Sequence, residues 1–177
     1  MQTSTPGPLV YYAARPHRRF GLLWAAASVS GVWAAAYGMD EAEFCAHAVE
    51  RGPAHLVPDA AAVAAVLQQI AEFLDGQRQQ FELAVDWHGM SAFQIAVRQA
   101  VMTVPFGQTA SYGEIAAAVG RPLAARAVGG VQARNPISFI IPCHRIIGSD
   151  GRLAGYGGFG GLETKRWLLK LEGTKID

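Results

Sequence analysis

The stretch Ile137-Ser-Phe-Ile-Ile-Pro-Cys-His-Arg-Ile-Ile147 places a thiol and an imidazole side by side within an apolar run. A short apolar run predicts a buried strand, so we expect Cys143 and His144 at the end of one. A thiol is a strong nucleophile only as the thiolate, and a free cysteine, with a pKa of about 8.5, is mostly protonated at neutral pH. We therefore expect His144 and Arg145 to lower the pKa of Cys143. The alternative is an inert buried cysteine beside a satisfied histidine.

The length and composition allow one large domain or two small ones, since 51% of the 177 residues are hydrophobic. Two cysteines, Cys45 and Cys143, are too few for a disulfide framework, so we expect a cytoplasmic protein with a free thiol. Residues 20–39 carry no charge and have the composition of a membrane anchor. Because Ser28-Val-Ser-Gly31 interrupts them, we expect two buried strands joined by a tight turn, and no membrane association.

Charge is distributed unevenly along the chain. Residues 1–88 contain 5 Lys and Arg against 9 Asp and Glu, a balance of −4, whereas residues 89–177 contain 10 against 5, a balance of +5. A basic half that carries the reactive thiol favours an anionic partner, and nucleic acid is the candidate we expect. A solvated basic face would have the same composition, so charge alone leaves both interpretations open.

Residues 1–88 have the pattern of a small α/β unit. We expect helices over residues 40–49 and from Asp59, which is a capping residue, to Gly76, which ends the helix. Alternating apolar and polar residues predict a further strand near the end of this half. The predicted strands cover residues 10–14, 22–27, 32–37 and 81–87. No catalytic motif occurs in this half of the sequence.

Residues 89–177 have the pattern of short helices. Two capping boxes, Ser91 with Gln94 and Ser111 with Glu114, predict helices that begin there and run to about 102 and 119. A further helix is predicted from Leu123 to about 133, and a last one over 162–171. Helix, tight turn and helix beside a basic surface is the outline of a helix-turn-helix.

The helix predicted over 123–133 has an unusual composition. Gly129 and Gly130 each cost about 1 kcal/mol relative to alanine inside a helix. A surface of Ala and Gly lets a backbone approach closely, and Arg126 is its one long cation. A smooth helix with one arginine fits a shallow groove of DNA. Helix packing through small residues would explain the glycines equally well, so both interpretations stay open.

The run Gly155-Tyr-Gly-Gly-Phe-Gly-Gly161 lacks the Gly-Lys-Ser/Thr ending of a phosphate-binding loop. We interpret it as a flexible wall over the active site, with Tyr156 as its large polar aromatic residue. The helix that follows ends at Glu172-Gly173. Glu172 is the carboxylate that we expect to orient His144.

Several motifs together resemble the O6-alkylguanine-DNA alkyltransferases, and the resemblance covers about residues 91–173. They are Pro142-Cys-His-Arg145 with its flanking isoleucines, Asn135-Pro136, Ser111-Tyr-Gly113 and Ala124-Ala-Arg-Ala-Val-Gly129. The resemblance implies an α/β ribonuclease H-like structural domain over 1–88. It implies a mainly α DNA-binding alkyltransferase domain with a helix-turn-helix over 89–177.

The resemblance also implies the activity, which is single-turnover DNA repair. The alkyl group of O6-alkylguanine, with O4-alkylthymine as a further candidate, would move irreversibly to Cys143 as thiolate after nucleotide flipping from the minor groove. His144 would take the thiol proton through a water and Glu172 would hold the imidazole. Asn135 would tie the preceding turn to the active-site backbone, and Tyr112 would push on the DNA backbone and donate a proton to the leaving base.

The remaining site residues follow from the same resemblance, which has Arg126 filling the space of the flipped nucleotide. The implied DNA contacts are Arg126, Tyr112, Gln94, Arg121, Gly129, Arg134 and Ser149. The implied pocket for the alkyl group consists of Pro136, Ile146, Tyr156 and Gly157. The glycine stretch before Leu162 is about two residues longer than in vertebrate members, which predicts room for bulkier alkyl groups.

The expected partner is double-stranded DNA with O6-alkylguanine, bound by a monomer. Some members bind zinc in the first half through paired Cys and His. Only Cys45 lies there in this chain, so we predict no metal, and we predict no cofactor. Two other functions compete with repair: a lesion sensor that binds damaged bases without transfer, and a multiple-turnover cysteine hydrolase or redox sensor. The intruding arginine argues against the second, and the presence of Cys143 argues against the first.

Overall fold

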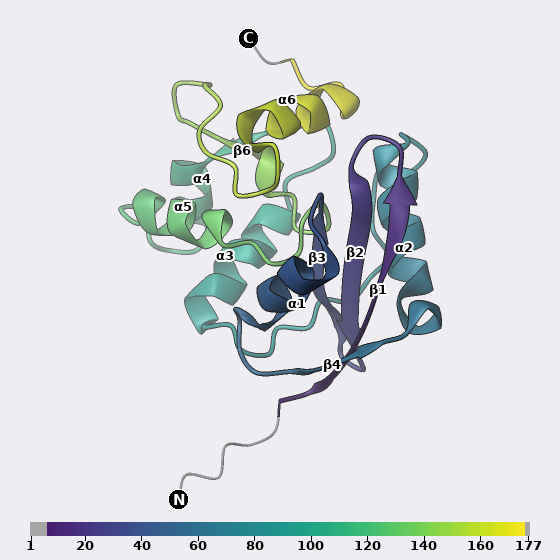
Figure 1. Cartoon of the computed structure of the whole chain (residues 1–177). Helices are drawn as coiled ribbons and strands as arrows, with labels where there is room; N and C mark the ends of the chain where they lie inside the picture. Colours follow the sequence, from purple (N-terminus) through teal and green to yellow (C-terminus); the bar gives the residue numbers. More distant parts are fainter. Residues whose placement is uncertain (1–6, 176–177) are drawn as a thin grey trace, which may run out of the picture.

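The computed structural model describes residues 7–175 and places a sheet with two helices beside a group of further helices (Figure 1). The sheet has the order β3-β2-β1-β4, in which β1 pairs antiparallel with β2 and parallel with β4, and β2 pairs antiparallel with β3. The elements of this half are β1 (Leu9–His17), β2 (Gly21–Ser28), β3 (Gly31–Tyr37), α1 (Glu41–Val49), β4 (His55–Pro58) and α2 (Ala60–Leu74).

The second half consists mainly of helices (Figure 1) and contains a short parallel strand pair, β5 with β6. In chain order its elements are α3 (Ala92–Met102), β5 (Ala110–Ser111), α4 (Tyr112–Ala118), α5 (Ala125–Ala133), the 3-10 helix η1 (Cys143–Arg145), β6 (Ile146–Ile147) and α6 (Gly161–Leu171). The capping boxes Ser91 with Gln94 and Ser111 with Glu114 are both present, which confirms the predicted starts of α3 and α4.

Successive side chains of a strand point to opposite faces of the sheet, and both faces of this sheet are covered. On one face Trp24 and Trp33 pack with α1, and the Trp24 ring stacks on Phe44 with centroids 5.1 Å apart. On the other face Leu23 and Tyr37 join a core that contains the buried residues of α2 and of the second half. The face opposite α1 is therefore the one that supports the rest of the molecule.

The uncharged stretch forms β2 and β3, as predicted, and Gly31, the first residue of β3 after the turn, has a φ of 133°. Within residues 7–175 no helix is long and apolar enough to span a bilayer. The helices predicted at Asp40 and Asp59 are also confirmed, and each aspartate accepts backbone N–H groups of the first turn.

The strand predicted over 81–87 is wrong. Only an isolated bridge joins Val85 to Val32, through the hydrogen bonds from Val32 N to Ala84 O and from Asp86 N to Val32 O. Alternating apolar residues report one buried face, and an extended segment that lies on a core has the same pattern. In its place the sheet gains β4, which the sequence analysis missed because it is short and ends at Pro58, as edge strands often do.

The apolar run 137–141 is not a strand either. A single bridge joins Ile137 to Ala35 of β3, after which the chain turns through Phe139, whose φ is 69°. A left-handed conformation at a bulky residue is strained and persists only when its surroundings over-determine it. The Phe139 ring is stacked on Tyr37 with centroids 4.8 Å apart, and it contacts Phe20 and Phe73 from the first half. The sheet and α2 thus hold the turn that leads to Cys143.

Candidate active site

Asn135 is the hydrogen-bonding centre of the turn before Cys143. Its Nδ2 donates to the carbonyl of Ile141 at 2.9 Å, to that of Ile137 at 3.3 Å, and to Sγ of Cys143 at 3.3 Å. Its Oδ1 accepts from the backbone N–H of Ile137 at 3.1 Å. One side chain therefore closes the turn and contacts the sulfur.

Cys143 begins η1, and 7% of it is exposed. Burial raises the pKa of its thiol, and the hydrogen bond from Asn135 and the charge of Lys165 offset this rise only in part. The pKa of Cys143 is therefore raised, contrary to the expectation: His144 lowers it only slightly, through a backbone hydrogen bond, and Arg145 is not among the groups that lower it. The positive charge of Arg145 is committed to another partner, and His144 is neutral. The resting residue is a thiol, and a base must take its proton during reaction.

His144, Arg145 and Glu172 form a fully buried polar cluster. Glu172 Oε1 lies 2.7 Å from His144 Nε2 and 3.0 Å from Arg145 Nη2, and Oε2 lies 3.0 Å from Arg145 Nε. The backbone N–H of Gly107 also donates to Oε2 at 3.0 Å. Burial raises the pKa of Glu172, but the hydrogen bonds from His144 and Arg145 and the charge of Arg145 outweigh this effect and hold that pKa at about 2.

The tautomer of His144 follows from this cluster. Burial lowers the pKa of His144, so the imidazole is neutral. Because Nε2 faces a carboxylate, Nε2 carries the hydrogen and donates it, and Nδ1 carries the lone pair. Nδ1 has no hydrogen-bond partner among residues 7–175. The cluster thus presents a neutral base in the residue that follows the thiol.

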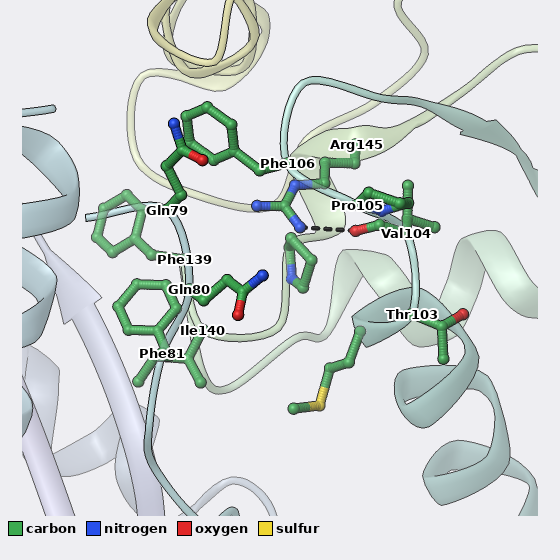
Figure 2. A pocket seen from close by; sticks show the side chains of 12 residues that line it. Gln79, Gln80, Phe81, Thr103, Val104, Pro105, Phe106, Phe139, Ile140 and Arg145 are labelled. Atoms are coloured by element: carbon green, nitrogen blue, oxygen red, sulfur yellow. Dashed lines mark hydrogen bonds between the residues drawn. The ribbon is translucent and has the colours of Figure 1, made fainter. Parts of the chain in front are cut away.

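Arg145 also reaches the far side of the active-site segment. Figure 2 shows its guanidinium donating to the Val104 carbonyl, at 2.7 Å, in a hollow walled by the rings of Phe81, Phe106 and Phe139. This hollow has a volume of about 390 Å³ and does not include Cys143 in its lining. Arg145 therefore connects Glu172 to the loop after α3.

Cys143 lines a smaller cavity of about 270 Å³. A second hollow, of about 490 Å³, contains Arg126 and Ser149 and shares two lining residues with this cavity, Tyr112 and Gly129. The Tyr112 ring lies 3.8 Å from the position that a Cβ on Gly129 would take. The remaining lining residues of the cysteine cavity are Gln132, Ala133, Gly155, Tyr156 and Gly157. An outer hollow at α5 thus adjoins the inner cavity that holds the thiol.

The glycine-rich wall is constrained by close contacts. A Cβ on Gly157 would lie 2.4 Å from the Ala133 carbonyl oxygen, and one on Gly158 would lie 2.5 Å from the hydroxyl of Tyr37. That hydroxyl, at the end of β3, donates to the Phe159 carbonyl at 3.0 Å and lies 3.4 Å from the Tyr156 hydroxyl. The two glycines let the wall lie against α5 on one side and against the first half on the other.

Four predicted site residues lie elsewhere. Gln94 and Arg134 line a separate hollow of about 190 Å³, and Arg121 packs over the Phe93 ring at 5.2 Å. Pro136, predicted in the alkyl pocket, lines that same separate hollow, and its carbonyl accepts from the N–H of Ala35.

Ile146, also predicted in the alkyl pocket, is completely buried in the core. The lining of the cysteine cavity therefore does not match the prediction for Pro136 and Ile146. The prediction for these two residues came from the resemblance, and in this structure both are buried by packing within the protein. Tyr156 and Gly157 do line this cavity.

Three buried polar residues were missed by the sequence analysis. Lys165 is fully buried, and its Nζ donates to the carbonyls of Ile146, Ala154 and Gly155. Burial lowers the pKa of Lys165 to about 8, and the electrostatic attraction of an ionised Cys143 opposes this shift only in part. The sequence contained an indication that Lys165 is buried, because Lys165 shares a helical face with Leu168, Leu169 and Glu172.

Arg98 and Gln132 are the other two, with exposures of 2% and 5%. Arg98 Nη2 donates to the Arg134 carbonyl at 2.9 Å, one residue before Asn135. Arg98 lies three residues before the buried Val101, and Gln132 lies four residues after the buried Val128. Each therefore shares a helical face with a buried valine, which was the available indication in the sequence. No group of three or more His, Cys, Asp or Glu able to hold a metal ion occurs in the described range 7–175.

Comparison with known proteins agrees with this geometry. The family described as "6-O-methylguanine DNA methyltransferase, DNA binding domain" matches residues 92–174. A methylated-DNA–protein-cysteine methyltransferase of Mycobacterium bovis is 45% identical over 121 residues, which are 68% of this chain and 72% of the relative.

Two solved structures from Mycobacterium tuberculosis are similar over nearly the whole chain. The O6-methylguanine methyltransferase has a TM-score of 0.75 and 37% identity, with 92% of each chain covered. The OGT protein in complex with DNA has a TM-score of 0.73 and 38% identity, with 93% of this chain and 92% of the other covered. The α/β fold with its sheet and helices is thus common to these proteins, and the chain belongs to the methylated-DNA–protein-cysteine methyltransferase family.

Proposed function

We propose that the chain repairs O6-alkylguanine in DNA and that Cys143 is the residue that accepts the alkyl group. One observation carries the assignment: Cys143 lines a cavity, and the next residue, His144, presents an unpartnered Nδ1 while Glu172 holds its Nε2. A thiol with a raised pKa needs such a base. The same arrangement supports O4-alkylthymine as a further substrate class.

The reaction is a direct displacement. His144 Nδ1 takes the thiol proton, through a water, and the sulfur attacks the alkyl carbon. The S–C bond forms as the C–O bond to guanine breaks, and the electron pair leaves with the base. Tyr112, half-buried at the boundary of the two hollows with a pKa raised by burial, donates a proton to the leaving base. Because a thioether does not hydrolyse, each molecule acts once.

Glu172 and Asn135 are positioning residues: they orient the imidazole and the sulfur. Glu172 holds the imidazole in the Nε2–H tautomer and stabilises it as it gains charge. Asn135 donates to Sγ, which favours the thiolate as it forms, and its bonds to the Ile137 and Ile141 carbonyls keep the sulfur in place. The positive charge of Lys165 lowers the pKa of Cys143 and thus also stabilises the thiolate.

The DNA surface is the outer hollow along α4 and α5, which we assign as the helix-turn-helix. Arg126 and Ser149 line it, and Gly129 leaves α5 smooth where a groove would approach. Arg126 enters the base stack in place of the extruded nucleotide, since a buried thiol cannot reach a stacked base. Gln94, Arg121 and Arg134 lie outside this hollow and would contact only the flanking phosphates.

The division of labour follows the halves of the chain. Residues 1–88 form a ribonuclease H-like structural domain, and residues 89–177 form the DNA-binding alkyltransferase domain. The partner is double-stranded DNA with O6-alkylguanine, bound by a monomer. The DNA complex of the M. tuberculosis OGT protein supports this proposal. A non-catalytic lesion sensor is not supported, because the relatives are named methyltransferases and a cysteine stands in the cavity.

The proposal is tested with a duplex that carries one O6-methylguanine. We expect the intact mass to rise by one methyl group, the modified peptide to contain Cys143, and the product to stop at one per protein. Cys143→Ser is the inactive control and Cys45→Ser the active one. Binding without a mass change would support a sensor, and product in excess of protein would contradict single turnover.

A further inference from the structure

Gln132 is a buried amide without a partner in the cavity of the reactive thiol. It lies on α5, one turn beyond Gly129, and lines the cavity together with Cys143 and Tyr156. Only 5% of it is exposed, yet neither Nε2 nor Oε1 has a hydrogen-bond partner within residues 7–175. Neither end of the amide is therefore paired with a protein group in the described range.

An unpaired buried amide is costly, and nine in ten buried polar groups in proteins have a partner. Two buried charged groups near the cavity follow that rule. Lys165 donates to three carbonyls, and the Glu172 carboxylate accepts from His144, Arg145 and Gly107. An apolar side chain of similar size would avoid the cost at position 132. The amide is thus best explained by a ligand that enters the cavity and pairs with it.

We infer that Gln132 determines substrate specificity by hydrogen-bonding the extruded O6-alkylguanine base. The inference rests on the proposed function, because it requires a base in this cavity. The side chain offers one donor, Nε2–H, beside one acceptor, Oε1. It therefore matches a ligand edge that places an acceptor beside a donor.

The alkylated base has such an edge, and guanine does not. Alkylation at O6 removes the proton from N1, so N1 becomes an acceptor next to the N2 amino donor. Unmodified guanine presents two donors there, N1–H and N2–H, and one of them would face the donor of the amide. Gln132 thereby favours the damaged base, and the match is lost when alkyl transfer restores the N1 proton. Loss of the match promotes release of the repaired base.

The test compares single-stranded oligonucleotides, which remove the duplex-opening step from the measured rate. One carries O6-methylguanine and the other 6-methoxypurine, which lacks the N2 amino group. We expect Gln132→Met to slow methylation of Cys143 about tenfold with O6-methylguanine and no more than about threefold with 6-methoxypurine. Gln99→Met, at an exposed glutamine of α3, is the matched control and keeps the wild-type rates.

The melting temperature provides the second measurement. Gln132→Met is expected to melt at or above the wild-type temperature, since the substitution removes an unpaired amide. If Gln132→Met does not fold, Gln132→Leu is used in its place. Equal slowing of both substrates, or no slowing with O6-methylguanine, would overturn the inference. If the wild-type protein transfers no methyl group to Cys143 from either oligonucleotide, the proposed function itself is wrong.

Discussion

The two halves of the molecule bury different kinds of side chain. In the part of the chain that the structure describes, the first half buries few polar or charged groups, namely Asp86, next to the boundary, and the side chains of His17 and Arg51. The second half buries Arg98, Gln132, Ser138, His144, Arg145, Lys165 and Glu172. The first half therefore gains stability from apolar contact, and the second carries groups that cost stability unless each is paired.

The halves meet at the active-site turn. The strained residue Phe139 is held by rings from β3 and α2, and Tyr37 at the end of β3 holds the glycine-rich wall. An apolar half without catalytic residues can thus keep a polar site in a conformation that the site would not adopt alone. This comparison leads to four predictions.

The most severe change is Glu172→Gln, which leaves Arg145 buried without a counter-ion. Breaking a buried ion pair costs about 3–5 kcal/mol, and loss of the oriented base costs about 10²–10⁴ in rate. Chemical denaturation and single-turnover alkylation measure the two effects. Glu163→Gln, at an exposed position on the same helix, is the control and is expected to change neither. A wild-type rate for Glu172→Gln would remove Glu172 from the mechanism.

Lowering the pH should destabilise the second half through Glu172 and His144. The folded pKa of Glu172 is about 2, below its ordinary value of 4.5, so its contribution to stability is present above pH 4.5 and is lost as the pH falls towards 2. Burial also lowers the pKa of His144, so its protonation favours unfolding as the pH falls below 6.5.

We therefore expect the free energy of unfolding to fall steadily from pH 6.5 to pH 2. Denaturation curves across this range measure the loss. Glu172→Gln is expected to show a weaker dependence below pH 4.5, and an unchanged dependence would mean that other carboxylates dominate acid unfolding.

A matched pair of core substitutions separates support of the fold from support of the site. Phe44 and Phe139 are both buried, one on the α1 face and the other at the active-site turn. Phe44→Leu and Phe139→Leu should each cost on the order of 1–2 kcal/mol. Only Phe139→Leu is expected to slow alkyl transfer, measured where both variants are folded. Equal rates for the two variants would show that the turn does not depend on the first half.

The mildest change is Tyr37→Phe. It removes one hydroxyl whose bond to the Phe159 carbonyl is worth about 1 kcal/mol, so the melting temperature should fall by a few degrees. Because the glycine-rich wall loses its anchor, the ratio of benzyl to methyl transfer rates should shift. Tyr11→Phe, on the same sheet, is the control. An unchanged ratio would confine Tyr37 to a packing role.

Much of this protein follows from local sequence. The three long strands, the capping boxes and the helices are properties of contiguous residues, since caps and apolar periodicity depend only on neighbours along the chain. The adjacency of Cys143 and His144 is likewise a property of the local sequence. Glu172 was predicted as the partner of His144 as the carboxylate near the end of the last helix, and the 2.7 Å contact confirms that the two meet.

Tertiary structure alone decided the rest, because burial and pairing depend on residues far apart in sequence. The apolar runs 81–87 and 137–141 look like strands, but the sheet accepts only one bridge from each. The pKa of Cys143 rises because the second half closes over it, and this closure is invisible in the tetrapeptide. The unpartnered amide of Gln132 likewise exists only because α5 faces the cavity of the thiol. Sequence thus predicted a nucleophile and its base, and packing determined the protonation state of the thiol and the polar lining around it.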